Sequence, residues 1–282
     1  MRSSFVILGG ALVMSVFAAG CRIEAHTQTR FDNSPNTTKE STKAWAGERI
    51  EVVNDGINPA TGKSGLEIKF DTAATKISIT AEVSAWADDD KKADADANIK
   101  DVLESGITIT EETGVFKIHC GHGKGHGTSS AAGAGCKRLT VNMPVGSAQQ
   151  GIDLVAGNGN GDLIIGTSSA LGNIKSLKAD NNGAGDVTVK VSPVPNGGAI
   201  QVTGEFNVTV SLPSAMSTKS VTLAVDEDDP AKATARIRAS AFPGITSTKP
   251  YPVEGAKIDA FESLSINSKG ILDSDYLTLN AF

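Results

Sequence analysis

Two cysteines and two histidines around one Gly-rich stretch are the residues of this chain best suited to bind a metal ion or to form a disulfide. Cys120, His122 and His126 lie close together, and Cys136 follows shortly after them. Two thiolates and two imidazoles form a donor set that binds zinc tetrahedrally. Because the intervening residues are mostly Gly, Ala and Ser, ordering them around a metal ion costs much conformational entropy. We therefore expect a disulfide between Cys120 and Cys136, with a zinc site and free thiols as the alternatives.

A disulfide at these positions would close the neck of a hairpin. Cys120 ends one predicted strand, and Cys136 opens the next. The chain-entropy model gives such a bridge a stabilising contribution of about 3 kcal/mol. His122 and His126 are then solvated loop residues. We add the hypothesis that the loop 121–135 binds a transition metal weakly through these histidines, and we expect no cofactor.

Other candidate sites are weaker. The acidic run 226–229 lacks the turn glycines that would wrap it around calcium, so it reads as a solvated loop. The Gly-Asn stretch 157–162 leads into a strand and predicts a corner, since a phosphate-binding loop would be followed by a helix. No Gly-x-Ser-x-Gly turn is present, and no pair of carboxylates stands in an aromatic-rich setting. We therefore expect that the protein is not an enzyme.

The N-terminal residues have the layout of an export signal. Arg2 supplies positive charge, the apolar run from Phe5 to Phe17 is too short to span a bilayer, and small residues precede Cys21. Residues 18–21, Ala-Ala-Gly-Cys, resemble the lipobox of bacterial lipoproteins. The resemblance implies that the signal peptide, residues 1–20, is removed and that Cys21 carries the lipid, a palmitate label being its test. Cleavage as an ordinary secretory signal is the alternative, and it also exports the protein.

Cysteine number and charge fit an exported protein that binds no nucleic acid. With Cys21 assigned to lipid, the two remaining cysteines form a pair, as expected in an oxidising compartment. The net charge of -6, without a Lys/Arg cluster, argues against a nucleic-acid partner. Arg22, where some lipoproteins have aspartate, resembles the pattern of lipoproteins sorted to the outer membrane. The expected partners are the membrane, through the anchor, and an envelope polymer or protein, with the oligomeric state unknown.

The elements that position these residues are mainly short strands. Residues 21–46 are polar and predict a flexible tether. From residue 47 onward, apolar and polar residues alternate with the period of half-buried strands, as in 66–70 and 76–83. The exception is 88–103, where an acidic start and apolar residues on one face predict one short helix.

A repeat runs through the second half of the chain. Gly-Asp at 161–162 and 185–186 and Gly-Glu at 204–205 each precede an alternating strand, with a period a little over 20 residues. This periodicity predicts that residues 47–282 form a single all-β domain, a β-solenoid of stacked short strands. From Asn142-Met143-Pro144 to Leu212-Pro213, the order and spacing of these motifs resemble the bacterial putative-adhesin domain family of unknown function. The resemblance implies a β-solenoid and an envelope role, and it carries no binding residues.

Three function classes follow from the predicted localisation and fold. The first is a cell-envelope lipoprotein with a noncatalytic, adhesin-like binding or structural domain, which we favour. The second is an envelope scaffold or sensor-associated lipoprotein. The third is a polysaccharide-active enzyme, which would need a carboxylate pair lining a groove.

Overall fold

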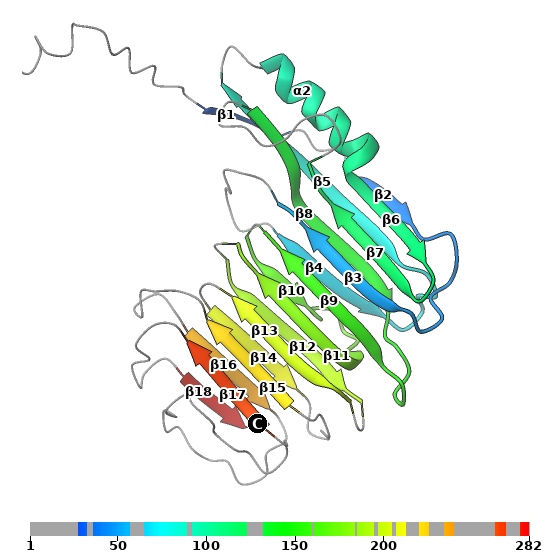
Figure 1. The fold of residues 1–282 in the computed structure, drawn as a ribbon, viewed down its shortest axis with the longest axis vertical. Coiled ribbons are helices and arrows are strands. Elements are labelled where there is room, and N and C mark those ends of the chain that lie inside the picture. The colour runs from blue at the N-terminus through cyan, green and yellow to red at the C-terminus, as the bar shows by residue number, and fades with distance from the viewer. Residues whose placement is uncertain are drawn as a thin grey trace, which may run out of the picture.

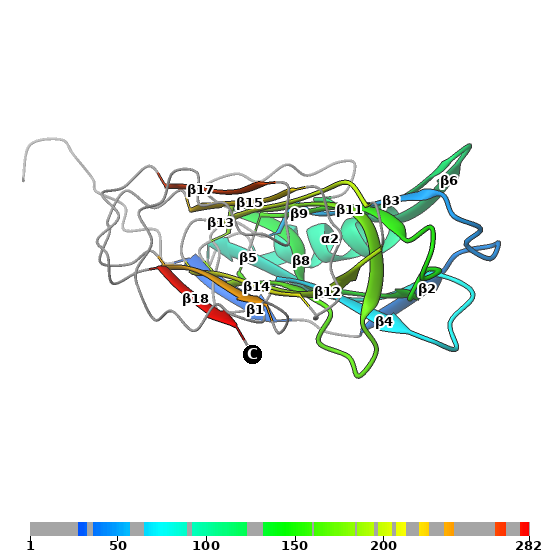
Figure 2. The ribbon, with the colours of Figure 1, turned by 90° about the horizontal axis from the view of Figure 1, so that it is seen from below.

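The computed structural model describes residues 28–32, 36–56, 65–88, 92–122, 132–159, 161–183, 185–194, 197–204, 207–212, 220–225, 234–239, 263–268 and 277–281. Its strands form two facing layers, which are seen edge-on in Figure 2. Layer A contains β1 (Gln28–Asp32), β2 (Thr37–Glu40), β4 (Leu66–Asp71), β5 (Ser78–Asp88), β8 (Ala132–Pro144), β10 (Leu163–Ile165), β12 (Val187–Pro193), β14 (Asn207–Leu212), β16 (Thr234–Ala239) and β18 (Leu277–Ala281). Layer B contains β3 (Arg49–Asn54), β6 (Ile107–Glu112), β7 (Val115–Cys120), β9 (Ile152–Asn158), β11 (Gly172–Asn181), β13 (Ala199–Gly204), β15 (Ser220–Val225) and β17 (Ser263–Ser268).

Most of the chain is built from rungs, a rung being one strand of layer B followed by one strand of layer A. In the rungs β9–β10, β11–β12 and β13–β14, each strand pairs in parallel with its equivalent in the next rung. The rungs β15–β16 and β17–β18 continue this pattern. Figure 1 shows the rungs running from the middle of the molecule to its C-terminal end.

The rung β3–β4 is out of sequence order. Strand β3 pairs in parallel with both β7 and β9, and β4 pairs in parallel with both β8 and β10. The first rung of the chain therefore lies between two rungs that come later.

The two layers are joined through β11. Its first residues, Gly172 to Ile174, pair with Val191 to Pro193 of β12, whereas Leu177 to Asn181 pair with strands of layer B. The layers are thus parts of one sheet that curls into a nearly closed barrel, rather than a clear solenoid. The predicted all-β class with one short helix is confirmed for the described part of the chain.

The core lies between the layers and is made of matching apolar positions. Within a rung, alternate side chains point inward, as the burial pattern of β9 and β12 shows. Parallel pairing in register then stacks these side chains from rung to rung. One such row in layer A, fully buried, consists of Leu139, Leu66, Leu163 and Val187. Each rung therefore buries its inner face against its neighbours as well as against the opposite layer.

The predicted flexible tether over 21–46 is wrong in part. Strands β1 and β2, which lie inside that range, pair antiparallel with β5. The free backbone edge of β5 explains the difference, because polar residues complete a sheet edge as readily as apolar ones when backbone groups make the bonds. Residues 33–35 and the rest of the range before β1 lie outside the described residues.

The predicted helix is present but shorter. Strand β5 continues to Asp88, the helix α2 spans Lys92–Asp101, and a π-helical turn follows at Val102–Gly106. Ala95 and Ile99 of α2 are buried, and the helix packs on β5 and β8 at the end of the molecule opposite the C-terminal rungs. The proposed acidic cap residues 89–90 lie outside the described residues.

Candidate functional site

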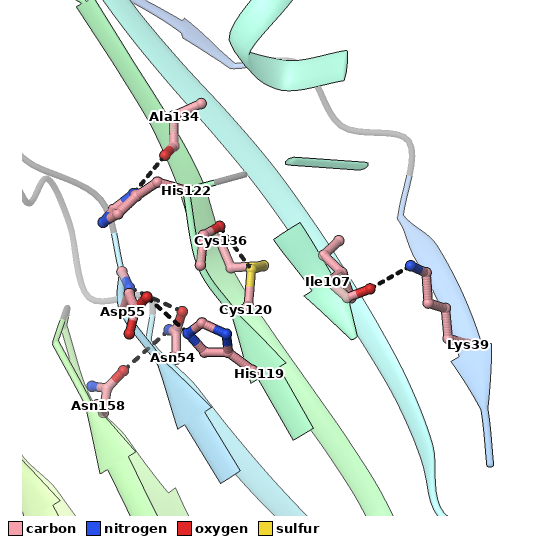
Figure 3. Close-up of a disulfide and its surroundings, with 12 residues drawn as sticks. Lys39, Asn54, Asp55, Ile107, His119, Cys120, His122, Ala134, Cys136 and Asn158 are labelled. Atoms are coloured by element: carbon pink, nitrogen blue, oxygen red, sulfur yellow. Dashed lines mark hydrogen bonds and ion pairs between the residues drawn. A yellow bond between two sulfur atoms is a disulfide. The ribbon is translucent and has the colours of Figure 1, made fainter. Parts of the chain in front are cut away.

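The disulfide predicted between Cys120 and Cys136 is present, with the two Cα atoms 6.0 Å apart and both residues fully buried (Figure 3). The expected setting, a hairpin neck, is wrong. Cys120 ends β7 in layer B, and Cys136 lies within β8 in layer A, so the bridge joins the two layers. Because both sulfur atoms are bonded to each other, neither is a thiolate ligand or nucleophile. The zinc-site and free-thiol alternatives are therefore wrong.

Several predicted site residues lie outside the described part of the chain. These are Cys21, with the whole signal peptide, and His126, with most of the loop 121–135, as well as the acidic run 226–229. The corner expected at 157–162 is found between β9 and β10, where Gly161 has a positive φ of 65°. No helix in the described residues is long and apolar enough to cross a bilayer.

His122 is held by the backbone beside the disulfide. Its Nδ1 donates a hydrogen bond of 2.8 Å to the carbonyl oxygen of Ala134, which leaves Nε2 as the unprotonated nitrogen of the neutral ring. Within the described ranges, no group of three or more His, Cys, Asp or Glu side chains could hold a metal ion. The hypothesis of weak metal binding by His122 and His126 thus has only one of its ligands in the described structure, and it stays a prediction.

A second imidazole, which the sequence analysis did not single out, lies on the outer side of the same strand ends. His119 Nε2 donates to Asp55 Oδ2 over 2.8 Å (Figure 3). This hydrogen bond raises the pKa of His119 above its usual 6.5 and lowers the pKa of Asp55 below its usual 3.8, with the nearby His122 also lowering the latter. Gly121 leaves room for the pair, because a Cβ there would lie 2.8 Å from His119 Cε1. The pair lies next to the disulfide, whose sulfur atoms are bonded to each other and cannot serve it as nucleophiles.

A buried row of asparagines runs beneath this corner. Asn54, Asn158 and Asn181 occupy equivalent positions on β3, β9 and β11 and are each at most 2% exposed. Asn54 Nδ2 donates to Asn158 Oδ1 over 3.1 Å, and Asn158 Nδ2 donates to Asn181 Oδ1 over 2.8 Å. Asn181 Nδ2 in turn lies 3.2 Å from the carbonyl oxygens of Gly161 and Gly185. We call this row the asparagine ladder. Its amides donate hydrogen bonds to backbone carbonyl groups of the turns, and its side-chain bonds link three rungs.

At the opposite end of the layer-B strands lies a depression of about 440 Å³, which we call the layer-B pocket. It opens where the parallel strands β3, β9 and β11 begin, so it is separated from the His119 corner by the length of these strands. Its lining comes from four segments far apart in sequence: Gly47, Arg49, Gln149, Gln150, Gly151, Asp153, Lys175 and Val194. The pocket is missed by sequence analysis because no local motif contains its residues.

A β-bulge places Lys175 in the layer-B pocket. Ile174 pairs with Ile152 and Ser176 with Asp153, so Lys175 is the extra residue of β11. A bulge of this kind redirects a side chain and interrupts the ladder. The two carbonyl groups freed by the bulge are used by the loop after β12, since Val194 N donates to Ile174 O over 2.9 Å and Gly198 N donates to Lys175 O over 2.6 Å.

The floor of the layer-B pocket requires glycine. Gly151 has a φ of 66°, and a Cβ there would lie 2.6 Å from the backbone nitrogen of Lys175 and 2.7 Å from Val194 Cγ1. The turn before it is fixed by Ser147, whose Oγ accepts from Gln150 N over 2.9 Å. The backbone of the pocket is therefore held by hydrogen bonds and close packing on both sides.

The charges of the layer-B pocket are mixed. Arg49 and Lys175 supply two cations, and Asp153 supplies one carboxylate, which accepts a hydrogen bond from Ser176 Oγ. Arg49 uses Nε for an ion pair of 3.1 Å with Glu51. The amides of Gln149 and Gln150 add groups that both donate and accept. Such a lining suits reversible recognition of a polar, charged ligand.

Comparison with solved structures gives weak likenesses, among them two to proteins from Parabacteroides species. One is to a putative lipid binding protein from Parabacteroides distasonis ATCC 8503, with 12% identity and a TM-score of 0.27, and the other to a putative adhesin from Parabacteroides merdae ATCC 43184, with 10% identity and a TM-score of 0.21. Each covers 89% of this chain and 98% of that protein. No family model matches the chain, and no curated protein does. At these scores neither likeness carries a fold or function over to this chain, and the resemblance to the putative-adhesin family stays a prediction.

Proposed function

We propose that this protein is an exported cell-envelope lipoprotein whose β domain is a noncatalytic binding module. Residues 1–20 are its signal peptide, and Cys21 bears the lipid that anchors it, in the outer membrane where the host has one. The disulfide supports export, because such bonds persist in oxidising compartments. It also leaves Cys21 as the one cysteine of the chain without a partner cysteine, as acylation requires.

We also infer that the rungs are coils of a β-solenoid and that the joint between β11 and β12 is a corner of one coil. The support is the register of Leu163, Val187 and Val208, which are equivalent residues of consecutive rungs. Corner stacking supports it further, because a Cβ on Gly185 would lie 2.3 Å from the carbonyl carbon of Gly161. Glycine thus allows one corner to lie directly on the next.

The observation that carries the binding function is the layer-B pocket. Its residues come from separate rungs, its bulge is held by a dedicated loop, and its lining includes charged and amide side chains on an outer face of the sheet. Glycoside hydrolysis uses two carboxyl groups about 5 to 9.5 Å apart. The lining has one carboxylate, Asp153, and Ser176 already donates to it. Binding without bond cleavage is the function that fits these groups.

The anchor is tested by metabolic labelling. Wild type should incorporate radioactive palmitate and sediment with membranes, whereas a Cys21→Ser variant should do neither. A Cys120→Ser/Cys136→Ser variant should still be labelled, since it keeps the acylated position. Equal labelling of wild type and Cys21→Ser would refute the lipoprotein assignment.

Binding is tested with the purified full chain on isolated envelope fractions. We expect saturable retention of the chain, with no release of reducing sugar when a glycan panel is incubated with it. Retention that grows linearly with protein, without saturation, would refute a binding module and favour a passive scaffold. Release of reducing sugar would refute the noncatalytic assignment.

A further inference from the structure

We propose that the layer-B pocket binds an acidic sugar, by taking its carboxylate between Arg49 and Lys175 and its neighbouring hydroxyl groups on Asp153, Gln149 and Gln150. This inference rests on the proposed binding function and names the ligand class of that same pocket. It follows from strand register, from the free hydrogen-bonding groups of the lining and from the size of the pocket.

Strand register places the two cations on either side of the carboxylate. Ile50 pairs with Leu154, so Arg49 lies beside Asp153, and Asp153 pairs with Ser176 next to the bulged Lys175. Since adjacent strands are about 4.8 Å apart, Arg49 and Lys175 are attached roughly 10 Å from each other. Their long side chains can converge on one anionic group that sits over this strip of the sheet.

Arg49 is suited to a carboxylate. Its ion pair with Glu51 is made through Nε, and the two terminal Nη groups of the guanidinium form a planar pair of donors. Such a pair matches the two oxygens of a carboxylate in a bidentate contact. Lys175 Nζ has no ion pair among the described residues and lies on an exposed side chain, so it can add a second cation.

Asp153 narrows the ligand class. A carboxylate beside the anion site repels a phosphate dianion about twice as strongly as the single charge of a sugar carboxylate, and it accepts hydrogen bonds from the hydroxyl groups next to that carboxylate. One of its oxygens is bound by Ser176, which leaves the other available. Gln149 and Gln150, both exposed on their turn, offer donors and acceptors to further hydroxyl groups. A neutral sugar would bring no opposite charge to Lys175, and a simple anion would leave the amides of Gln149 and Gln150 unused.

The pocket size fits a sugar acid within a chain. A volume of about 440 Å³ lies in the range of small-molecule sites and corresponds to one or two pyranose rings. The depression is partly open to solvent, so a polymer can place one residue in it and continue past the rim.

The proposal is tested by calorimetric titration of the purified full chain with trigalacturonate and triglucuronate, each compared with its neutral methyl ester. We expect saturable binding of at least one acid and about tenfold weaker binding of its ester, because the ester lacks the charge that Arg49 and Lys175 contact. Binding should weaken as salt rises from about 50 to 300 mM. Arg49→Gln and Lys175→Gln should each reduce affinity about tenfold.

Lys178→Gln is the matched control, since it removes the same charge from an exposed position of the same strand outside the pocket, and it should bind within about twofold of wild type. Unchanged thermal midpoints will show that the variants fold.

The proposal fails if no acid binds, if the esters bind equally, if the pocket variants bind like wild type, or if equimolar inorganic phosphate or a free amino acid displaces the sugar acid. If Arg49→Gln/Lys175→Gln still binds envelope fractions saturably, the acidic-sugar inference fails while the binding function stands; if wild type binds no envelope fraction, the binding function itself fails.

Discussion

Replacing Asn158 by alanine should destabilise the domain far more than the loss of one polar side chain on its surface. Asn158 is the middle member of the asparagine ladder and is 2% exposed. It accepts from Asn54 over 3.1 Å, donates to Asn181 over 2.8 Å, and lies 3.2 Å from the carbonyl oxygen of Gly161. Alanine at this position removes all of these bonds and leaves Asn54 Nδ2 buried without its partner in the ladder.

The magnitude follows from these contacts. Two amide-to-amide bonds at about 1 kcal/mol each and one buried unpaired donor at about 2 kcal/mol sum to a loss of about 4 kcal/mol. Asn181 Oδ1 keeps a bond of 3.3 Å from Gly183 N, so it adds little to the loss. For a domain of this size, 4 kcal/mol lowers the thermal midpoint by about 10 °C.

The assay is thermal and urea denaturation of the full chain followed by circular dichroism. Asn182→Ala is the matched control, because it makes the same truncation at an exposed side chain of the same turn, and its cost should stay within about 0.5 kcal/mol. The double variant Asn158→Ala/Asn181→Ala should cost less than the sum of the two single variants by more than about 1 kcal/mol. Equal midpoints for Asn158→Ala and Asn182→Ala, or strict additivity, would refute the ladder as a coupled unit.

Three further perturbations test other parts of the fold. Because the pKa of His119 is raised in the folded state, its contribution to stability is complete below pH 6.5 and is lost as pH rises through the folded-state pKa. Because the pKa of Asp55 is lowered, its contribution is complete above pH 3.8 and is lost as pH falls through the folded-state pKa. The free energy of unfolding measured against pH should therefore contain a small contribution, below about 1 kcal/mol for this half-exposed pair, that is largest between these two pH values and is absent from a His119→Gln variant. Reducing the disulfide, which spans 16 residues of chain, should lower the free energy of unfolding by about 3 kcal/mol, and a chain lacking both cysteines should not respond to the reductant. Gly185→Ala should destabilise the fold strongly because its Cβ would collide with the backbone of Gly161, whereas Gly157→Ala, whose Cβ would meet only Val53 Cγ2 at 4.0 Å, should have nearly the midpoint of wild type; equal midpoints would contradict corner stacking.

The repeated strands could be predicted because their signal is local. Alternation over 66–70 and 185–189 reports directly which side chains face the core, and the structure has β4 and β12 there. The third repeat likewise precedes a strand of layer A, β14 at Asn207–Leu212, while its Gly204 is the last residue of β13. Strand β16 was not singled out, because Thr234–Ala239 carries arginines at alternate positions and reads as polar.

Sequence analysis could predict the disulfide, because two cysteines bond to each other in many folds. It could not predict contacts that depend on how distant strands are arranged. The prediction of export implies a bond between Cys120 and Cys136 whatever the fold, but it does not say which layers that bond joins. The ladder was missed because Asn54 and Asn158 are 104 residues apart and meet only through the displaced rung β3–β4. The layer-B pocket was missed for the same reason, since Arg49 and Lys175 become neighbours through β9 and a bulge that no alternation pattern reveals.

The displaced rung also sets the order in which the domain can assemble. Residues 49–71 precede both neighbouring rungs in the chain, so both of their strand edges stay bare until β7–β8 and β9–β10 have joined them. Pairing β3 and β4 with these later strands closes loops of up to about a hundred residues. The entropy cost of closing a loop grows only slowly with its length, but the distant strands take longer to meet. A nascent or truncated chain that ends before β9 therefore presents an open parallel edge to its neighbours, and aggregation competes with folding until that strand arrives.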